Sequence, residues 1–82
     1  MKDPIIKIDL HGQRQEEAIR RIDRILSKAV ASTYQIHLIH GYRGGEVLKD
    51  MIGQRYQDHP KIKRIVRGDN PGITVFVLRE LI

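Results

Sequence analysis

The chain contains no cysteine and no tryptophan, and three tyrosines and one phenylalanine are its only aromatic residues. Without cysteine it forms no disulfide bonds and no thiolate zinc sites, and it fits a reducing compartment such as the cytoplasm. A core with so few rings must be built from Ile, Leu and Val. No apolar run approaches membrane-spanning length, and no signal-peptide pattern follows Met1. We therefore expect a soluble, cytoplasmic protein with no membrane partner.

Negative charge is also scarce, because fifteen Lys and Arg stand against ten Asp and Glu, for a net charge of +5. The sequence pI is near 9.9. A positive potential on so small a body attracts polyanions, so nucleic acid is the favoured partner class and ordinary solubility charge is the alternative. The length of 82 residues predicts a single domain over 1–82.

The apolar pattern predicts six elements in the order β-α-β-α-β-β. Strands are expected over 4–9, 34–39, 62–66 and 73–78, and helices over 15–31 and 46–57. Right-handed crossovers place both helices on one face of the sheet. The predicted fold is therefore a two-layer α/β sandwich with a four-stranded mixed sheet. Glu17 and Arg21 are spaced to form an ion pair on the first helix, and Val47 is expected in the apolar stripe of the second.

The sequence Asp-Leu-His-Gly at 9–12 ends the first strand. Strand alternation puts Asp9 and His11 on one face and turns Leu10 into the core. A carboxylate beside an imidazole can orient it and raise its pKa for acid–base catalysis. The alternative is that Asp9 caps the turn and His11 is an ordinary exposed residue at the end of a strand.

The second strand ends in His-Gly at 40–41, and the loop to the next helix continues as Tyr-Arg-Gly-Gly. Glycines let successive backbone N–H groups point into one concavity, and Arg43 can grip a phosphate in bidentate fashion. Tyr42 offers a ring for stacking, whereas Glu46 opposes an anion at the helix start. The spacing matches neither a Walker A loop nor a dinucleotide fingerprint, so an ordinary glycine-rich turn is the alternative.

The remaining histidines are interpreted as structural. His37 lies in mid-strand on the face opposite His40, and His59 precedes Pro60 at a helix end. A zinc site formed by Asp9, His11 and His40 is rejected, because the spacings match no common metal pattern.

Together these segments strongly resemble the Smr domain, the small MutS-related domain, over essentially the whole chain. The matching segments are Asp-Leu-His-Gly at 9–12, Glu17-Ala18, Ile-His-Gly at 39–41, Gly45-x-x-Leu48, His59-Pro60 and Gly72-x-Thr74. The resemblance implies a fold like the C-terminal domain of translation initiation factor three, and nucleic-acid binding with endonuclease activity. Family members nick DNA or cleave RNA, and some bacterial ones cut messenger RNA at stalled ribosomes. Arg43 stands where the family usually has glycine, and this departure bears on substrate preference.

We therefore expect an endonuclease that needs no metal or other cofactor, acting on RNA in preference to DNA, with the ribosome as a further partner. The resemblance and the residue chemistry assign catalysis to Asp9, His11 and His40. In RNA the 2′-hydroxyl supplies the nucleophile. The alternative is a non-catalytic module that binds nucleic acid or the ribosome. The residues expected to bind phosphate are Gly12, Arg14, Gly41, Tyr42, Arg43, Gly44, Gly45 and Lys49.

Overall fold

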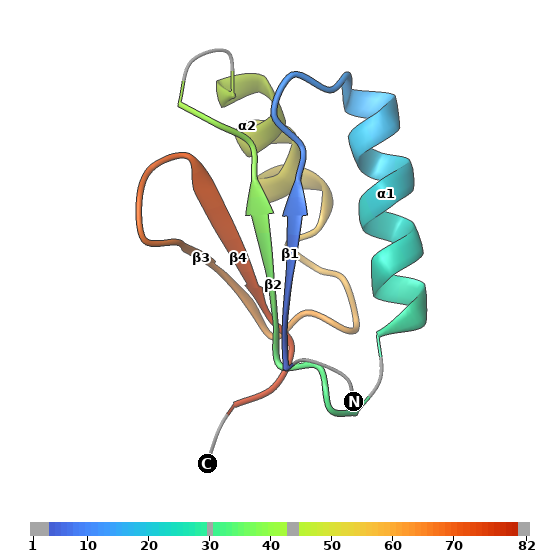
Figure 1. Cartoon of the computed structure of the whole chain (residues 1–82). Coiled ribbons are helices and arrows are strands. Elements are labelled where there is room, and N and C mark those ends of the chain that lie inside the picture. The colour runs from blue at the N-terminus through green and yellow to red at the C-terminus, as the bar shows by residue number, and fades with distance from the viewer. Residues whose placement is uncertain (1–3, 30, 43–44, 81–82) are drawn as a thin grey trace.

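The computed structural model describes residues 4–29, 31–42 and 45–80. It contains the six expected elements in the expected order (Figure 1). Within these residues, neither helix is long and apolar enough to cross a membrane. The strands are β1 (Ile5–Asp9), β2 (Gln35–Ile39), β3 (Arg64–Arg67) and β4 (Ile73–Val77), and the helices are α1 (Gln15–Lys28) and α2 (Glu46–Arg55).

The four strands form one mixed sheet in the order β1-β2-β4-β3. β1 runs parallel to β2, with Asp9 opposite Ile39 at the ends of the two strands. β4 is antiparallel to both of its neighbours, β2 and β3. β1 and β2 therefore send their carboxyl ends to the same edge of the sheet (Figure 1).

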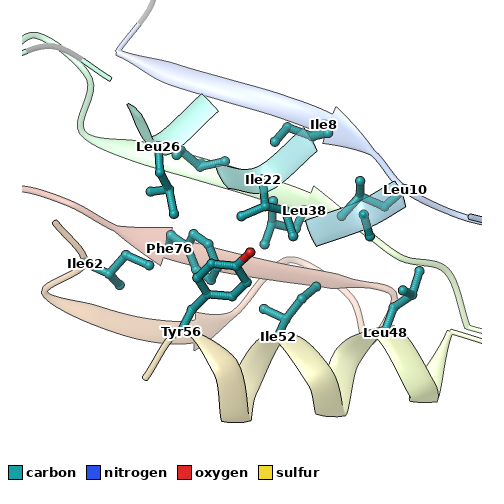
Figure 2. Close-up of a cluster of buried hydrophobic side chains, with 12 residues drawn as sticks. Ile8, Leu10, Ile22, Leu26, Leu38, Leu48, Ile52, Tyr56, Ile62 and Phe76 are labelled. Carbon is teal, nitrogen blue, oxygen red and sulfur yellow. The ribbon is translucent and has the colours of Figure 1, made fainter. Parts of the chain in front are cut away.

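Both helices pack on one face of this sheet, as predicted. Ile22 and Leu26 of α1 and Ile52 of α2 join one buried cluster with the strand residues Leu38 and Phe76 (Figure 2). Side chains alternate between the two faces of each strand. Those on the face that the helices cover fill the space between the sheet and the helices. The two-layer sandwich expected from the sequence is confirmed.

The helices differ from the prediction in three details, one of which is that α2 ends at Arg55 rather than Gln57. α1 ends at Lys28 rather than Ala31, because Ala29 already adopts an extended backbone and Lys61 Nζ donates a hydrogen bond of 2.7 Å to the Leu26 carbonyl. Val47 is 57% exposed instead of joining the core. It lies to one side of the stripe formed by Leu48 and Ile52. Val30, also expected in the core, lies outside the described residues.

A buried tyrosine links the two helices. The Tyr56 hydroxyl donates a hydrogen bond of 2.7 Å to Asp23 Oδ1 of α1, and burial raises the pKa of the Tyr56 phenol well above its usual value. Tyr56→Phe should lower the free energy of unfolding by about 1 kcal/mol, because it removes this bond and leaves the ring in place. Urea denaturation followed by circular dichroism measures the change. Full stability in Tyr56→Phe would show that the bond contributes nothing.

Candidate active site

The ends of β1 and β2 lie side by side, as expected. The Leu10 N–H donates to the Ile39 carbonyl at 2.8 Å and carries the parallel pairing one residue past β1. A Cβ atom added to Gly41 would lie 3.5 Å from the Cβ of His11. The two motifs recognised in the sequence therefore meet at one edge of the sheet.

Asp9 and His11 form a hydrogen-bonded pair at this edge. Their Oδ1 and Nδ1 atoms are 2.6 Å apart, and the side chains of Asp9 and His11 are 59% and 70% exposed. The ring and the backbone N–H of His11 both bond to the carboxylate and hold the Asp9 pKa below its ordinary value of 3.8. An ionised carboxylate accepts hydrogen bonds only, so Nδ1 carries the proton in this pair. When the ring is neutral, Nε2 is a free acceptor, and among the described residues it has no hydrogen-bond partner.

Arg21 of α1 also reaches this pair, which the sequence did not reveal. Its Nη1 donates a hydrogen bond of 2.7 Å to the Asp9 carbonyl, and its charge helps to lower the Asp9 pKa. The expected partner of Arg21, Glu17, instead accepts a hydrogen bond from the Arg14 N–H at 3.2 Å. Among the described residues no ion pair joins Glu17 to Arg21. Arg21 thus ties the first helix to the end of β1.

His40 lies at the same edge but points into the molecule. It is 2% exposed, and both ring nitrogens contact protein atoms. Nε2 is 2.8 Å from Thr74 Oγ1, and Nδ1 is 3.1 Å from the Gly41 carbonyl oxygen. A carbonyl accepts only, so Nδ1 donates to Gly41 and Thr74 donates to Nε2 when the ring is neutral. The structure therefore gives His11 a solvent-facing ring nitrogen and gives His40 none.

The loop after β2 is held by its glycines. Gly41 has φ of +88°, a left-handed conformation that favours glycine. A Cβ atom on Gly45 would collide with the Gly41 carbonyl oxygen and lie 2.6 Å from the carbonyl oxygen of His40. The Gly72 carbonyl accepts hydrogen bonds from the N–H groups of His40 and Gly41. The predicted phosphate-binding residues Arg43 and Gly44 lie outside the described residues.

A hollow of about 240 Å³ lies against this loop. It takes in five of the predicted residues, among them Lys49 and the exposed ring of Tyr42, and also Glu46. Asp9 and His11 are not among its lining residues. They belong to the neighbouring turn, with Gly12 at φ of +76° and exposed Arg14. The hollow is lined by His40, Gly41, Tyr42, Gly45, Glu46, Lys49 and Pro71.

The described side chains hold no group of three His, Cys, Asp or Glu arranged to bind a metal ion. The site does offer an imidazole with one nitrogen fixed by a carboxylate and the other open to solvent. An imidazole held in this way can take a proton from a bound hydroxyl through its open nitrogen. Lys49 lines the hollow beside the loop after β2, and exposed Arg14 follows the Asp9–His11 turn, so this edge of the sheet carries positive charge that can attract an anion.

The sequence of this chain is similar to those of known proteins. Residues 8–77 match the model of the Smr domain. The chain belongs to the Smr domain family. It is 35% identical over 79 residues to endonuclease MutS2 of Staphylococcus epidermidis, and 31% identical over 61 residues to endonuclease MutS2 of Helicobacter pylori. These matches cover 89% and 74% of this chain.

The crystal structure of the Smr domain of Thermus thermophilus MutS2 has the same fold. It superposes with a TM-score of 0.80 at 25% identity, covering 92% of this chain and 99% of that one. The chain spans only 10% and 8% of the two MutS2 proteins, so it corresponds to one small part of them. The likeness to a solved Smr domain confirms the predicted fold and family.

The Asp9–His11 pair of this Smr domain can be tested by titration. His11→Ala should raise the Asp9 pKa toward 3.8, because it removes the ring that donates the shorter hydrogen bond. Because its pKa is lowered in the folded state, the Asp9 carboxylate stabilises the fold at neutral pH. This stabilisation is lost as the pH falls through the lowered pKa. Carbon-13 NMR of the Asp9 carboxyl in both proteins measures the change. An unchanged titration would show that the pair does not form in solution.

The buried contact of His40 can be tested through its partner. Thr74→Val keeps the shape of the side chain but leaves His40 Nε2 without its partner. We expect the free energy of unfolding to fall by about 1–3 kcal/mol, the usual cost of an unpaired buried polar group. Thr74→Ser retains the hydroxyl and should recover much of the loss. Equal destabilisation by Val and Ser would assign the effect to packing rather than to the hydrogen bond.

Proposed function

We propose that this Smr domain is an endonuclease that cleaves RNA, with His11 as the proton acceptor and without a tightly bound metal. The observation that carries the proposal is the exposed Asp9–His11 pair, in which Nδ1 is held at 2.6 Å by an ionised carboxylate and Nε2 is left for substrate. The similarity to proteins named endonuclease MutS2 supports a nuclease. RNA is favoured over DNA because its own 2′-hydroxyl is the nucleophile.

In the proposed reaction, His11 Nε2 accepts the proton of a ribose 2′-hydroxyl. The 2′-oxygen forms a bond to the adjacent phosphorus, and the bond from phosphorus to the 5′-oxygen breaks. The leaving oxygen takes a proton from water, and His11 returns its own proton to solvent. The products are a 2′,3′-cyclic phosphate and a 5′-hydroxyl. Asp9 stabilises the imidazolium formed in the first step and keeps the ring oriented.

The loop after β2 is proposed to hold the phosphate backbone beside this pair. Lys49 and the exposed Tyr42 line its hollow, and Arg14 follows the Asp9–His11 turn. Arg43 is proposed to bind phosphate from the same loop. Ribosome-bound RNA is included among the proposed substrates.

His40 has a positioning role in this proposal rather than proton transfer. Its bonds to Thr74 and Gly41 join the start of the loop to β4, so the ring fixes the backbone on which substrate lies. This differs from the expectation of two imidazoles acting on one phosphate.

A module that binds RNA without cutting it is the second candidate. It is favoured by one observation, namely that the buried His40 ring presents no second imidazole to solvent for protonating the leaving group. The same loop and cations would then serve binding alone.

His11→Ala should lower the rate of RNA cleavage by about a hundredfold or more, the usual contribution of a positioned acid or base. His11 is exposed, so the fold and the affinity for RNA should be retained. Cleavage of a labelled single-stranded RNA is followed on denaturing gels with and without chelator. His37→Gln is the matched control, because His37 sits in mid-strand and contacts Gln35 at 2.9 Å, away from the proposed site.

Three results would contradict parts of this proposal. Equal cleavage by His11→Ala and wild type would remove His11 from the reaction. Normal cleavage of RNA carrying a single 2′-deoxy substitution at the scissile position would exclude the hydroxyl nucleophile. Binding of RNA and plasmid without cleavage of either would establish the binding module.

A further inference from the structure

The charges of α1 are divided between its two sides. Asp23 faces α2 and accepts the hydrogen bond of Tyr56. On the other side lie four cations, of which Arg24 is three residues from Arg21 and four from Arg20 and Lys28, the spacing that brings side chains together on one helix face. We call this group the basic flank of α1, and it consists of Arg20, Arg21, Arg24 and Lys28.

The basic flank borders β1, the edge strand of the sheet that carries the Asp9–His11 pair. Figure 1 shows α1 beside β1, with the start of the helix next to the turn that follows the strand. Arg21 makes the connection directly, since its Nη1 bonds to the Asp9 carbonyl at 2.7 Å. All four cations are exposed. The flank therefore leads away from the proposed reaction site along one side of the molecule.

The surface of this flank is hollowed near the start of α1. A depression of about 300 Å³ is lined by three of its arginines together with Gln13 and Glu17. Glu17 is the one acidic residue in that lining, and its Oε1 already accepts the Arg14 N–H. The large exposed apolar residues of the described chain (Ile5, Tyr42, Val47 and Val66) all lie outside α1. A cationic helix face that carries no large exposed apolar residue suits a phosphate backbone better than a membrane, which also needs buried apolar area.

Gln13 lines this hollow and carries a polar atom that is unsatisfied within the part of the chain that the structure describes. Gln13 Oε1 is buried and has no hydrogen-bond partner among the described residues. A phosphate cannot satisfy it, because an amide oxygen and an ionised phosphate oxygen both only accept hydrogen bonds. Once the Gln13 side chain rotates its amide oxygen into the hollow, a ribose 2′-hydroxyl can donate to it while the neighbouring phosphates face the arginines. DNA lacks this donor.

We propose that a single strand of RNA lies along the basic flank of α1, with phosphates at Arg20 and Arg24 and a ribose at Gln13. The strand reaches the Asp9–His11 pair past Arg21. This surface is separate from the loop after β2, and it rests on the proposed function in that it places the RNA that the pair would cut. Arg21 belongs to both parts, because it bonds to the end of β1 and lines the hollow.

The test compares two double variants that remove the same charge. Arg20→Gln with Arg24→Gln alters the flank and spares Arg21, which holds the end of β1. Lys63→Gln with Arg79→Gln is the control, because these exposed cations lie where β3 begins and β4 ends, at the edge of the sheet opposite the carboxyl ends of β1 and β2. Fluorescence anisotropy gives the affinity for a labelled single-stranded RNA at several salt concentrations, and thermal melting confirms that each variant folds.

The flank variant should lower the slope of log affinity against log salt by about 1.4, since each phosphate contact on a single strand contributes about 0.7. Between about 50 and 200 mM salt, wild type should then lose about sevenfold more affinity than the flank variant does. The control variant should keep the wild-type slope. An equal fall in both variants, or none in the flank variant, would overturn the proposed surface.

DNA of the same sequence and anionic vesicles complete the test. Wild type should bind the DNA more weakly than the RNA, and Gln13→Met should narrow that difference. Equal wild-type affinity for both would overturn the ribose contact. Flank-dependent binding to phosphatidylglycerol vesicles with unaltered RNA binding would assign the surface to a membrane instead.

Cleavage assays on the same proteins separate the two proposals. If wild type cleaves RNA and the flank variant binds RNA as wild type does, the proposed binding surface is wrong and the proposed nuclease activity stands. If binding depends on the flank but wild type does not cleave RNA, the proposed nuclease activity is wrong and the proposed binding surface stands.

Discussion

The parallel pairing of β1 with β2 is the constraint on which the site depends. Two neighbouring parallel strands must end at the same edge of a sheet, and here the pairing continues through the Leu10 N–H to the Ile39 carbonyl. The turn carrying His11 and the loop beginning at Gly41 are thereby brought together from distant parts of the sequence. Neither motif alone makes a site, and a helix between the strands is needed to join them. The burial of α1 against the sheet thus also positions the chemistry.

The third contribution comes from β4, which lies beside β2 rather than at the edge. Gly72 and Thr74 at the start of this strand hold the backbone and the ring of His40, respectively. Because these contacts are buried, the loop after β2 begins from a fixed point, while the Asp9–His11 pair stands in solvent. A rigid support under an exposed titratable pair favours precise placement of a proton acceptor.

The fold was readable from the sequence because its signals are local. Period-two and period-3.6 apolar patterns placed all six elements, and crossover handedness placed both helices on one face. The misplaced end of α1 reflects a contact between distant residues. The end of α1 is set in part by Lys61, more than thirty residues further along, which bonds to the Leu26 carbonyl at 2.7 Å. No local pattern reports such a contact.

The site was readable only in part. Alternation from Asp9 to His11 predicted that the two side chains share a face, which the structure shows, while their catalytic role stays a prediction. The same alternation applied to Ile36, Leu38 and His40 would have turned the His40 ring inward. Thr74 was singled out only by the Gly72-x-Thr74 resemblance, which did not indicate its contact with His40. Arg21 had none, because the reach of its side chain to Asp9 depends on how α1 packs beside β1.

The position of Arg21 links stability and function in one residue. A cation that donates to the last carbonyl of β1 stabilises the end of that strand, and its charge also favours the ionised form of Asp9. An ionised Asp9 in turn keeps the proton on His11 Nδ1 and leaves Nε2 open. A phosphate drawn to Arg21 would compete with Asp9 for the same positive charge. Substrate bound along α1 would therefore weaken the electrostatic effect of Arg21 on Asp9. The two hydrogen bonds from His11 to the carboxylate would remain, and these bonds mainly orient the pair.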